Sequence, residues 1–215
     1  MADTLKQLGD IPPSRVRMNP LPGTATERDL LAVLDHTNRL CELVDGTLVE
    51  KPMGFPESFL ASEIIRLVGN FVVEHDLGLV TAPDGTLRLM PGLVRLPDAA
   101  FISWKQLPKR KCPNEAIVSL IPELAVEVLS ASNTRREMER KLKEYFLAGS
   151  RIVWLVDPDN RTVDVHTAPD RFTRLQEGDA LDGGDVLPGF QLPLAQLFAR
   201  LEKAPRRPRR KRGAQ

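Results

Sequence analysis

The chain has 215 residues, of which 42% are hydrophobic and 27% are charged. This composition supplies the core of one ordinary domain and excludes a wholly disordered chain. No apolar run approaches the roughly 18 residues that a membrane-spanning helix needs, and the first ten residues lack the pattern of a secretory signal. Two cysteines, Cys41 and Cys112, form no CxxC pair, which argues against a cysteine-based zinc site and favours a reducing, cytoplasmic location.

Charge is distributed unevenly along the chain. Residues 205–215 hold six basic side chains and no acidic one, so the remainder has 24 basic and 29 acidic residues and a charge of −5. We expect residues 204–215 to be a disordered tail. Such a tail can contact nucleic acid non-specifically through its phosphates, in a salt-dependent way, but a purely solubilising role explains it equally well.

The N-terminal part divides at about residue 24. Residues 1–23 contain four prolines and no periodic pattern, which predicts an irregular lead-in before a domain spanning 24–203. Thr26 and Asp29 have the spacing of a capping box, and leucines at helical spacing follow them, so a helix is predicted to begin here.

A hairpin and a long helix are predicted next. Residues 41–49 alternate around Asp45 and Gly46, a dipeptide typical of a two-residue hairpin turn. After Pro56, apolar residues recur at three and four positions, which indicates a helix with one buried face. Residues 79–103 then change to short strands separated by Pro and Gly.

The second half of the chain predicts a strand, a helix and further strands. Residues 124–130 form an apolar run typical of a central strand that is covered on both faces. Thr134 and Glu137 form a second capping-box pattern, and residues 152–156 are another buried strand. A final short helix is expected at 194–201. This order of elements predicts an α/β fold with a mixed sheet.

Two acidic residues stand in unusual places in this pattern. Asp98 opens an apolar strand, and Glu127 interrupts the apolar run 124–129. A carboxylate inside a buried strand costs several kcal/mol unless it is paired or binds a metal. Two such strands side by side would bring both carboxylates to one Mg²⁺, an ion that prefers oxygen ligands.

A lysine on the following helix completes this candidate site. At about 100° per residue, Lys141 lies slightly closer than Lys143 to the buried face of the helix, so both remain candidates. An ammonium group there would stabilise negative charge on a phosphate under attack. The spacing alone also fits a structural interpretation, in which Asp98 caps a strand, Glu127 pairs with a nearby cation and Lys141 is solvated.

A family resemblance is carried by five segments of the chain: 41–46, 96–98, 122–130, 141–145 with Gly149, and 153–158. These segments resemble the Uma family of putative restriction endonucleases, which belongs to the PD-(D/E)XK nuclease superfamily. The similarity runs from about Thr24 to Phe198, and its most specific part is 127–158.

The resemblance implies a restriction-endonuclease-like fold, a mixed central sheet flanked by helices, preceded by an N-terminal helix and a β-hairpin. It also implies that Asp98 and Glu127 lie on adjacent strands with Mg²⁺ between them. The backbone carbonyl of Val128 would be a further ligand, and Mn²⁺ can replace Mg²⁺.

The resemblance also assigns two further residues. The superfamily's lysine usually stands two positions after the acid, where this chain has Leu129. The family is similar in lacking that lysine, and Lys141 matches the position that supplies it instead. Glu42 matches an acid in the family's first hairpin and would be an auxiliary catalytic residue.

The expected function is therefore Mg²⁺-dependent hydrolysis of phosphodiester bonds in DNA, for which a homodimer would suit cleavage of both strands. The alternative is a nucleic-acid- or partner-binding module that keeps the fold without cutting. The hydrolytic interpretation requires Asp98, Glu127 and Lys141 to converge around a cation, rather than to lie apart or in ion pairs under a closed surface.

Overall fold

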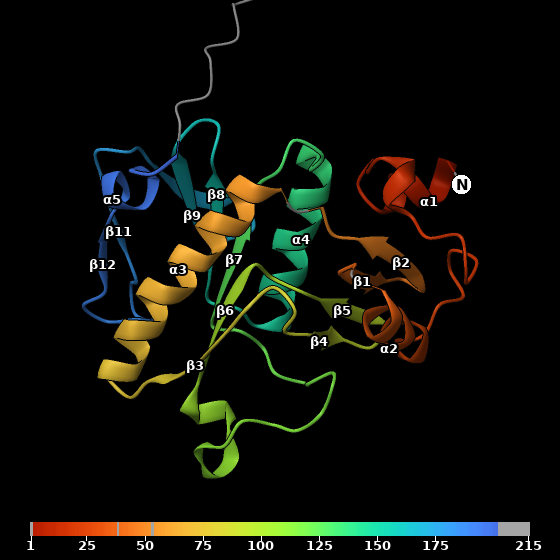
Figure 1. Cartoon of the computed structure of the whole chain (residues 1–215), viewed down its shortest axis with the longest axis horizontal. Helices are drawn as coiled ribbons and strands as arrows, with labels where there is room; N and C mark the ends of the chain where they lie inside the picture. Colours follow the sequence, from red (N-terminus) through yellow and green to blue (C-terminus); the bar gives the residue numbers. More distant parts are fainter. Residues whose placement is uncertain (1, 38, 53, 202–215) are drawn as a thin grey trace, which may run out of the picture.

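A computed structural model describes residues 2–37, 39–52 and 54–201 (Figure 1). The expected basic tail at 204–215 lies outside the described residues. The helices are α1 (Ala2–Gln7), α2 (Glu27–His36), α3 (Phe55–Glu74), α4 (Arg135–Ala148) and α5 (Leu194–Phe198), with short 3₁₀ turns at Pro13–Arg15, Trp104–Gln106 and Pro108–Arg110. The strands are β1 (Cys41–Val44), β2 (Thr47–Glu50), β3 (Gly78–Thr81), β4 (Leu87–Met90), β5 (Leu93–Arg95), β6 (Ala99–Ser103), β7 (Leu124–Val128), β8 (Ile152–Asp157), β9 (Thr162–Ala168), β10 (Arg171–Leu175), β11 (Ala180–Asp182) and β12 (Gln191–Pro193).

Two sheets make up most of the molecule. The main sheet has the order β10-β9-β8-β7-β6-β3, and a smaller sheet has the order β2-β1-β5-β4. In the main sheet, β7 and β8 are parallel and are joined through α4, whereas the other neighbouring strands are antiparallel. The predicted α/β fold with a mixed sheet is confirmed.

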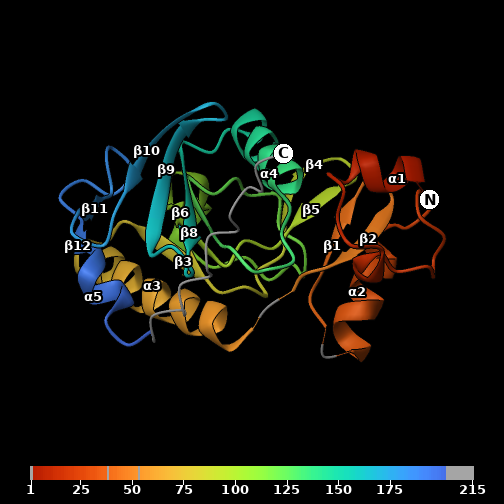
Figure 2. The same ribbon diagram turned by 90° about the horizontal axis from the view of Figure 1, so that it is seen from above.

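The two faces of the main sheet are covered by different helices, as Figure 2 shows. Side chains at alternate positions of β6, β7 and β8 pack with α3 and α5 on one face. The intervening side chains pack with α4 on the other face, together with the N-terminal segment and part of the smaller sheet. Because side chains alternate along a strand, both buried faces of β7 are apolar, and a charged residue there stands out.

The predicted turn and caps are confirmed. Asp45 and Gly46 have φ angles of 48° and 67°, as a type I′ turn requires at both central positions. Capping boxes are formed by Thr26 with Asp29 at α2 and by Thr134 with Glu137 at α4. Each box satisfies backbone N–H groups that the first turn of a helix leaves without partners.

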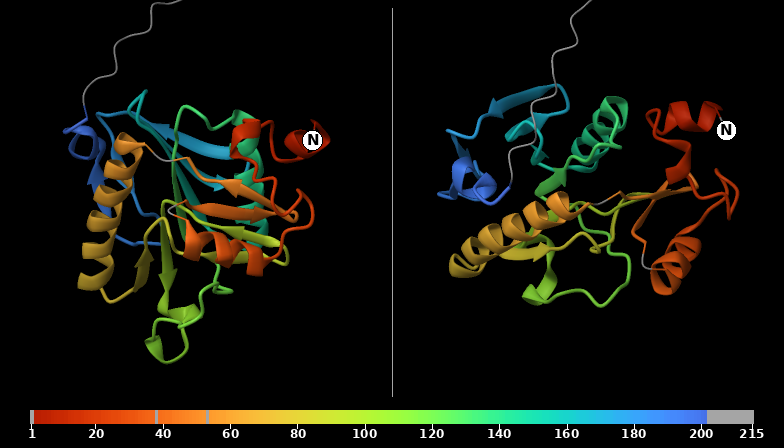
Figure 3. Two further views of the ribbon diagram at one scale, coloured as in Figure 1. Left: turned by 45° about the vertical axis from the view of Figure 1, so that its right-hand side comes forward. Right: turned by 45° about the horizontal axis from the view of Figure 1, so that its top comes forward.

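The N-terminal lead-in is more regular than its sequence indicates. It contains α1 and a 3₁₀ turn, and Figure 3 shows α1 beside α4. Leu8 and Ile11 are buried in the core below α4, and Gly9 approaches the backbone of Glu137 so closely that a Cβ atom would lie 2.5 Å from its nitrogen. These contacts join segments far apart in the chain, so no hydrophobic periodicity within residues 1–23 predicts them. Within the part of the chain that the structure describes, no helix has the length and apolarity needed to cross a membrane.

Candidate active site

The register of β6 and β7 brings the two predicted carboxylates together. Ala99 pairs with Val126, and the N–H of Asp98 donates to the carbonyl of Val126 over 2.8 Å, so Asp98 lies opposite Glu127. Both side chains are on the α4 face of the sheet. Asp98 Oδ2 also accepts a 2.6 Å hydrogen bond from the N–H of Val128, which fixes the carboxylate beside this peptide.

Lys141 extends from α4 into the same space. Its Nζ lies 3.0 Å from each carboxylate oxygen of Glu127 and 3.2 Å from Oε1 of Glu42, which comes from β1. Lys143 is exposed and makes neither contact. Of the two candidate lysines, Lys141 is the one that lies beside Glu127 and Glu42.

Tyr145, one helical turn after Lys141, is a neighbour that the sequence analysis did not single out. It is fully buried, and its hydroxyl donates to Glu127 Oε1 over 2.7 Å. Residues i and i+4 lie on the same face of a helix, and this spacing is why one helix supplies two donors to one carboxylate.

Lys51 is the main addition that the sequence analysis did not foresee. It follows β2 directly, and its Nζ lies 2.9 Å from Asp98 Oδ1 and 3.8 Å from Glu127 Oε2. The same ammonium also donates to the backbone carbonyl of Leu96. The Lys51 ammonium therefore contacts Asp98 directly and lies near Glu127, and these are the two predicted metal-binding carboxylates.

Arg95 is a further cationic residue that pairs with the carboxylates of this site. Arg95 Nη1 lies 2.6 Å from Glu42 Oε2, and its Nε donates to Glu144 Oε2 over 2.9 Å. Arg140, at the edge, holds the other oxygen of Glu144 at 2.6 Å. Seven charged residues bury their side chains in this group, and we call them the ion cluster: Glu42, Lys51, Arg95, Asp98, Glu127, Lys141 and Glu144.

Burial and mutual pairing set the ionisation of this cluster. Burial disfavours the charged form of Glu42, but the Lys141 ammonium and the Arg95 guanidinium outweigh it and hold the pKa of Glu42 well below its usual range. Burial likewise opposes the charge on Lys141, but Glu127 and Glu42 prevail and raise its pKa. Burial, reinforced by Glu127, raises the pKa of Tyr145. Lys141 is thus a permanent ammonium, and Tyr145 a hydrogen-bond donor, at neutral pH.

The sequence-predicted groups therefore converge, but in ion pairs beneath the surface. Glu42, Asp98, Glu127 and Lys141 are exposed by 1%, 2%, 4% and 2% of their residue surface. Arg95 could have been found by the signal that identified Glu127, because it is a charged residue inside an apolar stretch. Lys51 carries no such signal, since it follows a hairpin whose end is polar.

The donor groups are of the kind that Mg²⁺ prefers. Three oxygens, from Asp98, Glu127 and the carbonyl of Leu96, already surround one cation, the Lys51 ammonium. Mg²⁺ is usually held by one or two carboxylates and keeps several waters, so this oxygen set fits the ion. Among the described residues, no group of three or more His, Cys, Asp or Glu side chains is arranged to hold a metal, so further ligands have to be backbone oxygens or water.

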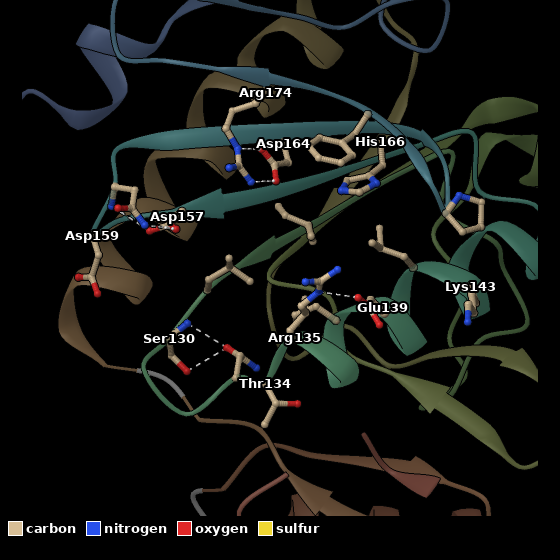
Figure 4. Close-up of a pocket in the computed structure, with 18 of the residues that line it drawn as sticks. Ser130, Thr134, Arg135, Glu139, Lys143, Asp157, Asp159, Asp164, His166 and Arg174 are labelled. Carbon is tan, nitrogen blue, oxygen red and sulfur yellow. Dashed lines mark hydrogen bonds and ion pairs between the residues drawn. The ribbon is translucent and has the colours of Figure 1, made fainter. Parts of the chain in front are cut away.

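A pocket of about 840 Å³ lies elsewhere, between α4 and the outer strands of the main sheet. In Figure 4, Glu139 and Lys143 extend from α4 on one side, and His166 and Arg174 lie on the strands opposite. Its lining does not include Asp98, Glu127 or Lys141. Acidic side chains outnumber basic ones in this pocket, which disfavours the binding of a polyanion there. The acidic residues are Glu57, Glu139, Asp157, Asp159, Asp164 and Asp170, and the basic residues are Arg135, Lys143 and Arg174.

Comparison with known proteins agrees with this architecture. The family model Uma2, described as putative restriction endonuclease, matches residues 28–195. The chain is also similar to the crystal structure of a putative nuclease belonging to DUF820 from Anabaena variabilis ATCC 29413, with 20% identity and a TM-score of 0.68. That alignment covers 76% of this chain and 92% of the other, and it supports the nuclease-like fold. A search of curated proteins found no match.

Proposed function

Because the chain belongs to the Uma2 family of putative restriction endonucleases, we propose that it is a Mg²⁺-dependent endonuclease that hydrolyses phosphodiester bonds in DNA. The observation that carries this proposal is the convergence of Asp98, Glu127 and Lys141 at the start of β6, the end of β7 and the middle of α4. Nuclease chemistry needs this combination, because oxygen ligands hold a divalent cation and an ammonium stabilises phosphate charge.

Asp98 and Glu127 would hold the metal, with the carbonyl of Val128 as a further ligand. When bound, Mg²⁺ supplies Lewis-acid chemistry, polarising the scissile phosphate and favouring ionisation of the attacking water. The peptide N–H of Val128 orients Asp98, and the Tyr145 hydroxyl orients Glu127. These two hydrogen bonds restrict the rotation of both carboxylates.

Lys141 is suited to stabilise negative charge rather than to remove a proton. Its pKa is raised, because Glu127 and Glu42 outweigh the effect of burial. A lysine that stays protonated is a poor general base but a good electrostatic partner for a phosphate that gains charge in the transition state. Glu42, 3.2 Å from its Nζ, would hold the ammonium in place.

The hydrolytic interpretation requires that its three groups are not ion-paired beneath a closed surface, and in this structure they are so paired. The closed state of the cluster therefore favours a second candidate function, and the proposed hydrolysis requires the cluster to open. With Lys51 on Asp98 and 1–4% exposure of the site residues, a phosphodiester cannot reach Glu127 unless the cluster opens. A chain in which it never opens would be a nucleic-acid- or partner-binding module that retains the nuclease fold without cutting.

Plasmid cleavage distinguishes these functions. We expect the purified chain to nick or linearise supercoiled plasmid with Mg²⁺ or Mn²⁺ and to stop when EDTA is added. Glu127→Ala should abolish cleavage while the far-UV circular dichroism stays unchanged. Asp164→Asn is the matched control, because Asp164 lies in the same cross-strand row of the sheet, two strands away. Full activity of Glu127→Ala would refute the catalytic assignment, and metal-independent retardation of uncut DNA would favour the binding module.

We also propose a cytoplasmic protein that acts as a homodimer, with the basic residues 204–215 adding non-specific contacts to nucleic acid. Light scattering on the purified chain gives its oligomeric state. Deletion of 204–215 should weaken DNA binding and reduce its salt dependence. Equal binding before and after deletion would assign the tail a solubilising role.

A further inference from the structure

Lys51 contacts the carboxylates that would hold a metal ion in this site. Its Nζ contacts one oxygen of Asp98 and the carbonyl of Leu96 and is 3.8 Å from Glu127. The proposed nuclease function assigns Asp98 and Glu127 to the metal, so the ammonium and the metal share two of their ligands.

Charge balance argues that both cations cannot be held together. The ion cluster contains four carboxylates and the three cations Lys51, Arg95 and Lys141, and Arg140 adds a fourth positive charge at its edge. The side chains of the three inner cations are 3–5% exposed, so water screens them poorly. Asp45 balances Arg140, so the cluster itself carries a net charge of −1. A dication that enters without the departure of a cation would leave the cluster with an uncompensated charge of +1, which is unfavourable in a buried region. Exchange of the Lys51 ammonium for the dication leaves the cluster neutral.

Lys51 is the cation that can leave without disturbing a helix or strand. Arg95 is the last residue of β5 and Lys141 lies within α4, so both are fixed by regular elements. Lys51 follows β2 and lies outside any helix or strand, and its backbone N–H is held by the carbonyl of Leu40 over 2.8 Å. A lysine ammonium on a flexible four-carbon stem can swing toward solvent while its backbone stays in place.

We propose that Lys51 is a built-in competitor of the divalent cation. Its ammonium neutralises Asp98 and Glu127 in the metal-free protein and must be displaced before the metal binds. Lys51 therefore sets the metal concentration at which the site loads and keeps the apo protein stable despite two facing carboxylates. This inference rests on the proposed function, because it takes Asp98 and Glu127 to be metal ligands.

Direct measurement of Mn²⁺ binding tests this role without an activity assay. Free Mn²⁺ is followed by electron paramagnetic resonance as the ion is titrated into the purified full chain and its variants. We expect Lys51→Met to bind Mn²⁺ at least about tenfold more tightly than the natural chain. Lys51→Arg keeps the charge and should stay close to the natural affinity. Lys105→Met, an exposed lysine outside the cluster, is the matched control and should change nothing.

A second substitution and a stability measurement show whether the measured Mn²⁺ binding occurs at this site. Lys51→Met combined with Glu127→Gln should lose the gain in affinity, which separates this site from adventitious binding in the acidic pocket. Without metal, Lys51→Met should melt at a lower temperature, and Mn²⁺ should raise that temperature more than it does for the natural chain. Lys51→Gln replaces Lys51→Met in the same comparison if the latter does not fold.

The outcomes separate this inference from the function it rests on. Equal Mn²⁺ affinity of the natural chain and Lys51→Met, with binding that depends on Glu127, would overturn the competitor role and leave the nuclease proposal intact. Absence of Glu127-dependent binding in every variant would overturn both.

Discussion

The hydroxyl of Tyr145 donates a 2.7 Å hydrogen bond to Glu127, one helical turn from the Lys141 ammonium that binds the same carboxylate. α4 thus supplies a neutral donor and a charged donor to one acidic side chain of β7. The aromatic ring packs in the core while its oxygen belongs to the candidate site. A single residue therefore links the packing of α4 on the sheet to the orientation of Glu127.

Replacement of Tyr145 by Phe should destabilise the protein by about 1.5–3 kcal/mol, the usual contribution of a hydrogen bond to a charged group. Phe preserves the ring and therefore the packing, so the loss reports the hydroxyl alone. Urea unfolding gives the free energy of unfolding. In a Glu127→Met background the same substitution should cost less than about 0.5 kcal/mol, because the acceptor is absent. An undiminished cost there would show that the hydroxyl acts elsewhere.

Replacement of Arg95 by Met should be among the most damaging changes in the chain. It leaves Glu42 and Glu144 without the guanidinium that now pairs both, and breaking a buried ion pair from one side costs roughly 3–5 kcal/mol. Arg135→Met is the matched control, since the Arg135 side chain is 92% exposed and its pair with Glu139 contributes at most about 1 kcal/mol. Similar midpoints of chemical unfolding for the two variants would contradict the assigned role of Arg95.

His166 should make stability depend on pH above the range in which carboxylates titrate. Burial lowers the pKa of His166 below 6.5, against weaker opposing effects of the Ala168 backbone and Asp164. The unfolded chain then takes up this proton more readily than the folded chain, so stability falls as the pH drops through about 6.5. Urea midpoints measured between about pH 7.5 and about pH 5.5 should show this slope.

The matching variant, His166→Phe, should have a flatter profile over the same range, because it has no proton to take up. Phe retains an aromatic ring against Phe172, which His166 stacks on at a centroid distance of 4.8 Å. His36→Gln, at an exposed position of α2, should keep the slope of the natural chain. A slope that persists in His166→Phe would assign the effect to another group.

The two cysteines should differ sharply in reactivity. Cys41 is fully buried in β1, and burial, with a smaller contribution from Glu50, raises the pKa of its thiol to about 11. Cys112 is exposed. A thiol reagent such as dithionitrobenzoate should titrate one thiol in the native protein at neutral pH and two after denaturation. Cys112→Ser should remove the native signal, whereas a fast second thiol in the folded chain would contradict the burial of Cys41.

Local sequence determined the elements and the identity of the main site residues. Capping boxes, the Asp45-Gly46 turn and hydrophobic periodicity depend on neighbours within a few positions, so α2, α4 and the first hairpin could be predicted without the fold. Glu127 was detectable for a similar reason, because one acid in an apolar strand departs from a local pattern. Asp98, at the head of an apolar strand, and Lys141, near the buried face of its helix, were also indicated by the local pattern. The family resemblance added Glu42, and all of these lie together in the structure.

What only the tertiary structure decided is how these charges are compensated. Lys51 follows β2, Arg95 ends β5 and Glu144 lies in α4, and nothing in their neighbouring residues indicates that they meet. The docking of the N-terminal segment on α4 is unpredictable on the same grounds. Ion pairing in a buried cluster is set by distances between segments far apart in the chain. The sequence by itself therefore determined three of the four carboxylates, Glu42, Asp98 and Glu127, and the three-dimensional packing added Glu144 and decided which cations pair with them.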